Sequence, residues 1–145
     1  MFVALFATAQ TGSAAISSSD RTLLGAMNQA RAAHGLAALR LDATLQRAAR
    51  AHSRDMLRRN YFAHGPYLQR IVSFGTRGPI VGENLAWGVG ARARASWIVQ
   101  AWLRSPLHRR NLLRPGFRRV GVASLRGTFN GLAGARVVTA DFAGT

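Results

Sequence analysis

Gly82-Glu83-Asn84 contains the only glutamate in a chain of 145 residues that has 20 arginines, no lysine and five acidic residues in all. His64 precedes this stretch and His108 follows it. Two imidazoles and one carboxylate are enough to hold a divalent metal or to move a proton. Their wide spacing means that only the tertiary structure could bring them together, so the stretch marks a candidate site.

Three further motifs accompany this stretch in a fixed order. Phe62-Ala63-His64 lies before it, and residues 102–113 follow it with the pattern W-x-x-S-P-x-H-R-x-N-L-L, before Phe117-Arg118-Arg119-Val120-Gly121-Val122. Together with G-E-N-L-A at residues 82–86, these motifs resemble the bacterial branch of the CAP superfamily. Its SCP domain is shared by cysteine-rich secretory proteins, antigen 5 and pathogenesis-related 1 proteins. The resemblance covers about residues 21–144, nearly the whole chain.

The resemblance implies an α+β fold, a single-domain α-β-α sandwich with a small antiparallel sheet, over residues 20–145. It also implies a cleft lined by two histidines and two glutamates. Three of these four positions match His64, Glu83 and His108, and the fourth, a glutamate in many relatives, falls on Ser105. The same comparison adds two neighbours to the predicted cleft, Asn84 and Arg70, with Arg70 as the counter-ion of Glu83 when no metal is bound.

The expected ligands, His64, Glu83 and His108, would leave an open coordination position on Zn²⁺ or another divalent metal. A water held there becomes acidic enough near neutral pH to act as a nucleophile, which leaves a metal-dependent hydrolase as an alternative. Hydrolysis also needs a general base, and the sequence suggests none nearby, because Asp55 falls on an outer helix face and Asp141 in the last strand. We therefore expect binding rather than catalysis.

The bound species is expected to be a divalent metal or a small apolar ligand, because the resembled family is linked to zinc, sterol and fatty-acid binding. A third interpretation is purely structural. In it, Glu83 pairs with Arg70 and both histidines stiffen a polar cluster without binding anything.

The formal charge of +15 predicts attraction to anionic partners, such as a cell-wall polymer, a lipid or a membrane surface. The alternative is a solvated basic shell without a dedicated partner. Basic residues are not interleaved with exposed aromatic residues, so we expect no specific nucleic-acid binding. The chain has no cysteine, which excludes disulfides and thiol catalysis.

Residues 1–19 read as a signal-peptide remnant or a disordered tail rather than as part of the fold. Residues 2–9 are mostly apolar, and Ala7-Thr8-Ala9 resembles a small-residue cleavage site, yet no basic residue precedes Arg21. We favour a signal peptide with an incomplete start, and hence an extracellular or cell-envelope location.

Apolar residues at helical spacing predict three long helices, at 20–34, 42–60 and 91–104. The expected N-caps are Asp20 or Ser19 for the first helix and Asp42 for the second. Ser105 and Pro106 are expected to cap and begin a further short helix, with His108 in its first turn.

His52 lies on the apolar face of the second helix and is expected to be a hydrogen-bonded core residue rather than a ligand. Residues 67–81 read as a loop. Residues 120–125 and 136–142 are rich in β-branched residues and predict an antiparallel hairpin joined by a glycine-rich loop at 127–134.

Overall fold

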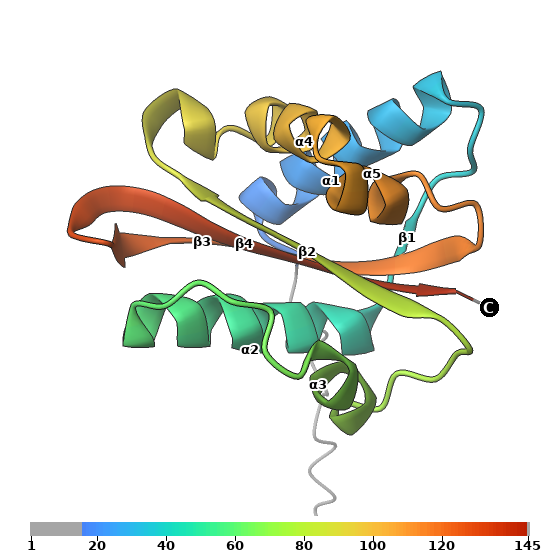
Figure 1. Ribbon diagram of the computed structural model, residues 1–145, viewed down its shortest axis with the longest axis horizontal. Helices are drawn as coiled ribbons and strands as arrows, with labels where there is room; N and C mark the ends of the chain where they lie inside the picture. The colour runs from blue at the N-terminus through green and yellow to red at the C-terminus, as the bar shows by residue number, and fades with distance from the viewer. Residues whose placement is uncertain (1–15, 145) are drawn as a thin grey trace, which may run out of the picture.

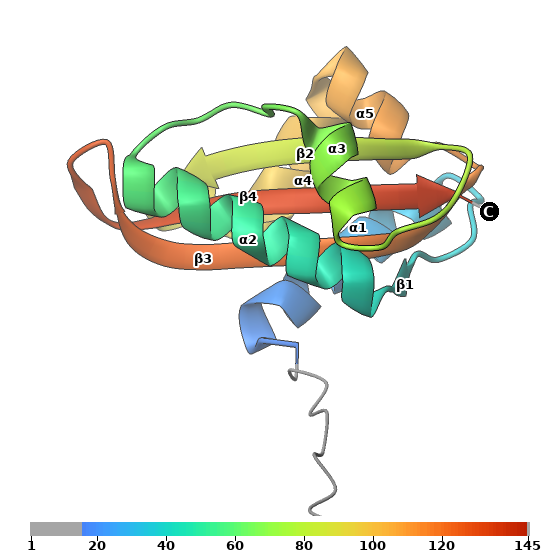
Figure 2. The ribbon, with the colours of Figure 1, turned by 90° about the horizontal axis from the view of Figure 1, so that it is seen from below.

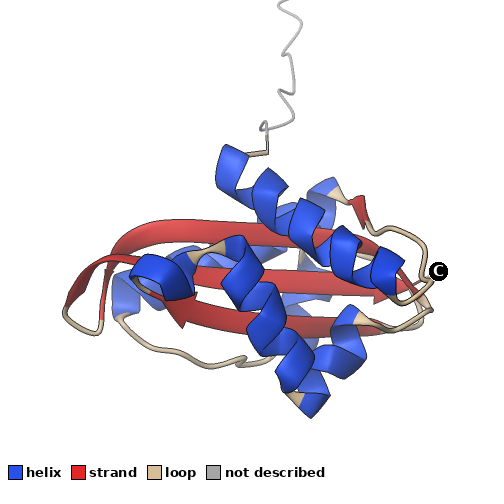
Figure 3. Ribbon diagram, turned by 90° about the horizontal axis from the view of Figure 1, so that it is seen from above, coloured by secondary structure: helices blue, strands red, loops and turns tan. Residues whose placement is uncertain are grey.

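The computed structural model describes residues 16–144, whose helices lie on both faces of one sheet (Figure 1). In chain order the elements are α1 (Ser18–Ala33), β1 (Arg40–Leu41), α2 (Ala43–Arg59), α3 (Tyr67–Ser73), β2 (Val81–Gly88), the 3-10 helix η1 (Gly90–Ala93), α4 (Ala95–Arg104), α5 (Pro106–Leu112), β3 (Phe117–Phe129) and β4 (Leu132–Gly144). Helices α2 and α3 cover one face of the sheet (Figure 2), and α1, α4 and α5 cover the other (Figure 3). The predicted α-β-α sandwich is confirmed.

The N-terminus of α1 differs from the prediction. Ser17 is the N-cap, and its hydroxyl accepts a hydrogen bond from the Asp20 N–H at 3.1 Å. The Asp20 side chain is fully buried instead and accepts from the N–H of Ser124 in β3 at 2.7 Å. The helix therefore begins at Ser18, before the predicted cap, because Ser17 caps it and the Asp20 carboxylate binds the sheet instead. Of the segment predicted as a leader or tail, residues 1–15 lie outside the described range, and Ser18 and Ser19 belong to α1.

Helix α2 agrees closely with its prediction. The carboxylate of Asp42 caps it by accepting from the N–H groups of Thr44 at 2.9 Å and Leu45 at 3.0 Å. His52 is 4% exposed, and its Nε2 bonds the carbonyl oxygen of Ala63 at 2.9 Å. His52 is thus the predicted core histidine.

The sheet has the strand order β1-β3-β4-β2 and is antiparallel except for the short parallel pair of β1 with β3. The β3–β4 hairpin is longer than predicted, because the expected glycine-rich loop is mostly strand. Its turn is only Asn130-Gly131, with φ angles of 48° and 75°. Two successive positive φ angles are typical of a type I′ turn, in which asparagine and glycine are favoured.

Strand β2 and helix α3 were not predicted. Four consecutive residues of β2, from 82 to 85, are buried because helices cover both sheet faces, so the strand lacks the alternation that marks a half-buried strand. Helix α3 lies within the predicted loop at 67–81. The predicted helix at 91–104 is instead divided into η1 and α4, because Arg94 has extended backbone angles of −75° and 141°.

The sheet packs on the two helical layers through separate apolar clusters. On the α1–α4 side, the rings of Phe117 and Phe142 stack with centroids 5.3 Å apart. Trp102 of α4 is also buried there, and its indole N–H donates to the carbonyl oxygen of Leu85 in β2 at 2.9 Å. This bond fixes α4 on β2, the strand that carries Glu83.

Candidate functional site

The candidate site is built around Glu83 in β2. Successive side chains of a strand point to opposite faces, so Glu83 faces α2 and α3 while Asn84 faces α5. The Glu83 side chain is fully buried. Its Oε1 atom accepts a hydrogen bond from Nδ1 of His64 at 2.7 Å, and its Oε2 atom is bound by the guanidinium of Arg70 in α3. Both oxygens are therefore engaged within the protein.

His64 is held in one tautomer by this contact. It lies in the segment between α2 and α3, and 47% of its side chain is exposed. Because Nδ1 donates to Glu83, the lone pair is left on Nε2 when the ring is neutral. Burial and the nearby positive charge of Arg70 lower the pKa of His64, which favours that neutral ring.

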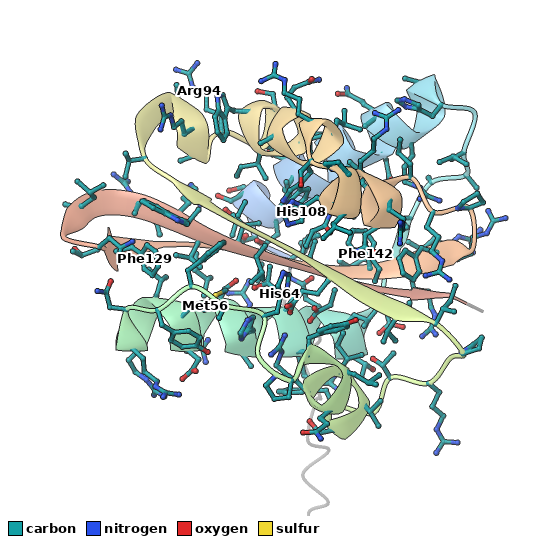
Figure 4. All side chains as sticks on the ribbon, viewed as in Figure 1. Met56, His64, Arg94, His108, Phe129 and Phe142 are labelled. Atoms are coloured by element: carbon teal, nitrogen blue, oxygen red, sulfur yellow. The ribbon has the colours of Figure 1, made fainter. Side chains whose placement is uncertain are left out.

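His108 reaches the site from the other helical layer. It lies in the first turn of α5, where Pro106 is the first helical residue, as predicted. Asn84 donates from Nδ2 to the carbonyl oxygen of His108 at 2.9 Å, and Nδ2 of Asn111 donates to Oδ1 of Asn84 at 3.0 Å. These bonds tie the start of α5 to β2. Figure 4 shows His108 and His64 on opposite sides of β2.

The environment of His108 also favours a neutral imidazole. Partial burial and the neighbouring His64 lower the pKa of His108. Ser105, the remaining predicted cleft residue, is the N-cap position of α5, but its side chain makes no capping hydrogen bond. Its backbone carbonyl accepts from the N–H of Arg109 at 2.8 Å, so Ser105 contributes to the start of the helix.

The site contains a second carboxyl group that the sequence analysis placed away from it. Asp141 of β4 is the direct cross-strand partner of Glu83 and is 0% exposed. The expectation that no other acidic residue lies near the motifs is therefore wrong. Antiparallel pairing of β2 with β4 brings the two side chains together on the same sheet face. Recognising β2 as a strand paired with the last strand could have revealed this partner.

The two carboxyl groups affect one another's protonation. Burial raises the pKa of Glu83 to about 7, against the opposing effect of Arg70. Burial and the adjacent Glu83 raise the pKa of Asp141 well above its usual range.

The donor set fits a metal only in part. Within residues 16–144, no three histidine or acidic side chains are placed to share one metal ion. Glu83 contacts His64 and Arg70. In this arrangement the Glu83 carboxylate orients the His64 ring and does not act as a third metal ligand. The groups free to bind a metal are Nε2 of His64 and the ring of His108.

The order of motifs and the sandwich fold agree with a known family. The sequence matches the family model described as CAP, the cysteine-rich secretory protein family, over residues 24–142. The chain belongs to the CAP family. The resemblance seen in the sequence is therefore confirmed, in a CAP chain that contains no cysteine.

Two relatives of this CAP domain come from Bacillus subtilis. The chain is 34% identical over 120 residues to the uncharacterized protein YkwD, a match that covers 79% of this chain and 46% of YkwD. It is 33% identical over 109 residues to the uncharacterized membrane protein YlbC, covering 72% of this chain and 31% of YlbC. The chain thus spans less than half the length of either relative.

Solved structures share the fold. An outer surface protein of Borrelia burgdorferi superimposes with a TM-score of 0.74 at 20% identity, covering 90% of this chain and 97% of the Borrelia chain. An extracellular SCP-domain protein of Bacillus anthracis superimposes with a TM-score of 0.70 at 27% identity, covering 88% of this chain and 40% of that protein. In the described part of this CAP domain, no helix has the length and apolar character needed to cross a membrane.

Proposed function

We propose that this CAP domain binds a divalent transition metal through Nε2 of His64 and the imidazole of His108. The observation that carries the proposal is the 2.7 Å contact between Nδ1 of His64 and the buried carboxylate of Glu83. A metal-binding histidine commonly donates its other ring N–H to a carboxylate, which fixes the tautomer and orients the ring. The environments that lower the pKa of both histidines also favour the neutral form that a metal requires.

Two imidazoles would leave several coordination positions for water or an exogenous ligand. When bound, Zn²⁺ would supply Lewis acidity at those positions. Glu83 is engaged by His64 and Arg70 and is not free to act as a general base toward an external molecule. The geometry therefore supports binding better than hydrolysis.

Titration calorimetry with Zn²⁺ tests the proposal. We expect the parent protein to bind zinc, and both His64→Ala and His108→Ala to lose most of that binding. His34→Ala is a matched control, because His34 is exposed and its ring bonds the carbonyl oxygen of Ala30 within α1. A parent that takes up no zinc would overturn the proposal and leave Glu83, Arg70 and the histidines as a structural cluster.

We also propose that the basic surface attaches the domain to an anionic cell-wall polymer or membrane surface in an extracellular or cell-envelope setting.

The acidic residues do little to neutralise the positive charge of that surface. Asp20 pairs with Arg50 and Asp42 pairs with Arg119, while Glu83 is buried against Arg70. Asp55 already contacts Arg58 and Arg59, and Asp141 is buried beside Glu83. Much of the charge of +15 is thus left to face solvent.

Binding to an anionic matrix should weaken steeply as NaCl is added, because screening and counter-ion release remove the electrostatic attraction. Retention on an immobilised polyanion, measured across a salt gradient, checks this expectation. Uncharged dextran is the matched control matrix. Weak retention already at low salt would contradict the proposal.

A further inference from the structure

Asp141 lies directly across from Glu83 in the sheet, and within residues 16–144 no donor reaches its carboxyl group. Neither Oδ1 nor Oδ2 has a hydrogen-bond partner among the described residues. The side chain is fully buried, and its direct cross-strand neighbour is Glu83, also fully buried. Buried carboxyl oxygens without donors are rare in proteins. A proton on one of the two carboxyl groups would allow a hydrogen bond between them.

The charges around the pair require the same conclusion. Arg70 supplies one positive charge, and it binds Glu83. His64 donates to Glu83 from Nδ1. The buried His52 of α2 lies near Arg70 and His64, and it is neutral because burial lowers its pKa to about 4. One cation can balance one carboxylate, and a second ionised carboxylate beside it would be a buried charge without compensation.

We propose that Asp141 is a positioning residue of the site: its protonated carboxyl donates a hydrogen bond to Glu83, which remains the single carboxylate facing His64 and Arg70. The raised pKa of Asp141, caused by burial and by the adjacent Glu83, agrees with this assignment. Asp141 of β4 then supplies the second carboxyl group of the site. In the resembled family the second carboxyl group is a glutamate at the position of Ser105.

This assignment gives Asp141 a defined effect on His64. The O–H of Asp141 and the guanidinium of Arg70 approach Glu83 as donors and hold its carboxylate in place, so that it accepts from Nδ1 of His64. The lone pair of Nε2 is thereby directed away from Glu83. The consequence for metal affinity depends on the proposed function, but the proton on Asp141 and the tautomer of His64 do not.

The matched pair of variants is Asp141→Asn and Asp141→Ala. Asparagine is nearly isosteric and has an N–H₂ group that can replace the donor, whereas alanine removes it. In the metal-free protein at neutral pH, ¹⁵N NMR of the imidazoles should show His64 protonated on Nδ1 in the parent and in Asp141→Asn. In Asp141→Ala the tautomer ratio should shift toward Nε2–H. If Asp141 had a merely structural role, asparagine would not restore the Nδ1–H tautomer of His64 that is lost with alanine.

Infrared difference spectroscopy provides a measurement that depends on neither metal nor the folding of the alanine variant. The parent should show the carbonyl stretch of a protonated carboxyl at neutral pH, and Asp141→Asn should lack that band. Asp55→Asn, which alters a partly exposed carboxylate, should retain it. Absence of the band from the parent, or loss of the Nδ1–H tautomer in Asp141→Asn, would overturn the assignment.

Zinc titration of the same variants separates this inference from the proposed function. We expect Asp141→Asn to bind zinc within about twofold of the parent and Asp141→Ala to bind about tenfold more weakly, as is typical for loss of a group behind a metal ligand. A parent that binds no zinc but shows the infrared band and the expected tautomer would remove the metal proposal alone. Equal zinc affinities for the parent and both variants would contradict the positioning role.

Discussion

The Nδ1 atom of His64 lies 2.7 Å from Oε1 of Glu83, and the two residues differ sharply in environment. The imidazole is 47% exposed, whereas the carboxylate is fully buried in the central sheet. An exposed ring that is fixed from behind by a buried carboxylate can present Nε2 to solvent in one orientation. That relationship makes Glu83 the residue whose replacement tests the site most directly.

Replacing Glu83 by glutamine should weaken both stability and binding. The substitution keeps the shape of the side chain but leaves Arg70, whose side chain is 14% exposed, without its carboxylate. We expect a loss of about 3 kcal/mol in the free energy of unfolding, typical of breaking a buried ion pair. Zinc affinity should fall by about 10-fold to 100-fold. Chemical denaturation and calorimetry measure the two effects.

Asp55→Asn is the matched control for this charge removal. Asp55 is partly exposed and pairs with Arg58 and Arg59 at the surface, where such pairs contribute about 1 kcal/mol or less. If Glu83→Gln proved no less stable than Asp55→Asn, the central role of the buried pair would be refuted.

Asn84→Ala should separate the positioning of His108 from general stability. The fully buried Asn84 links β2 to α5 through the carbonyl oxygen of His108 and the amide of Asn111. Its removal leaves buried polar groups unpaired, at a cost of about 1–3 kcal/mol. We also expect weaker zinc binding, because the start of α5 loses its attachment to β2.

The control is Asn28→Ala. Asn28 makes two comparable bonds with the backbone of Leu39, at 2.8 and 3.1 Å, on a different part of the fold. It should lower stability without changing zinc affinity. Equal affinity losses in both variants would show that the effect of Asn84→Ala is not local.

His52 should make folding stability fall in acid. Burial lowers the pKa of His52 to about 4 in the folded protein, against about 6.5 in the unfolded chain. Between these values the unfolded state binds more protons, so the contribution of His52 is fully present above pH ~6.5 and is lost as pH falls toward ~4. The expected loss is about 3 kcal/mol.

Urea denaturation at a series of pH values measures this slope. In His52→Gln the corresponding part of the pH dependence should disappear, whereas His34→Gln, at an exposed position, should retain it. An unchanged slope in His52→Gln would assign the acid sensitivity to other groups.

Gly121→Ala should be among the most destabilising small substitutions in the chain. A Cβ atom at position 121 would lie 2.0 Å from the carbonyl carbon of Leu45, where α2 crosses β3. Because backbone cannot yield as a side chain can, we expect a loss of about 3 kcal/mol. The control is Gly25→Ala in α1, where nothing lies within 4 Å and alanine should stabilise by about 0.5–1 kcal/mol. Similar melting temperatures for the two variants would contradict the close packing.

Local sequence determined helices α1 and α2 and the existence of the β3–β4 hairpin. Asp42 and the apolar positions of α2 specify that helix through contacts that span at most one or two turns. The same periodicity placed His52 in the core, and the order of motifs around Glu83 identified the family. Each of these features depends on residues that are close in the chain or on a pattern that can be read along it.

The Arg70–Glu83 pair was predicted from the sequence and is confirmed, but tertiary structure alone decided that Asp141 lies beside Glu83. Strand β2 is buried on both faces and shows no alternation, so its pairing with β4 is not visible in its own residues. That pairing sets Asp141 opposite Glu83, while α3, within the predicted loop, supplies Arg70. Backbone hydrogen bonds between strands are common to all residues, and register is specified mainly by an alternating hydrophobic pattern. Because β2 is buried on both faces and lacks that alternation, its own residues do not show which side chains lie opposite it.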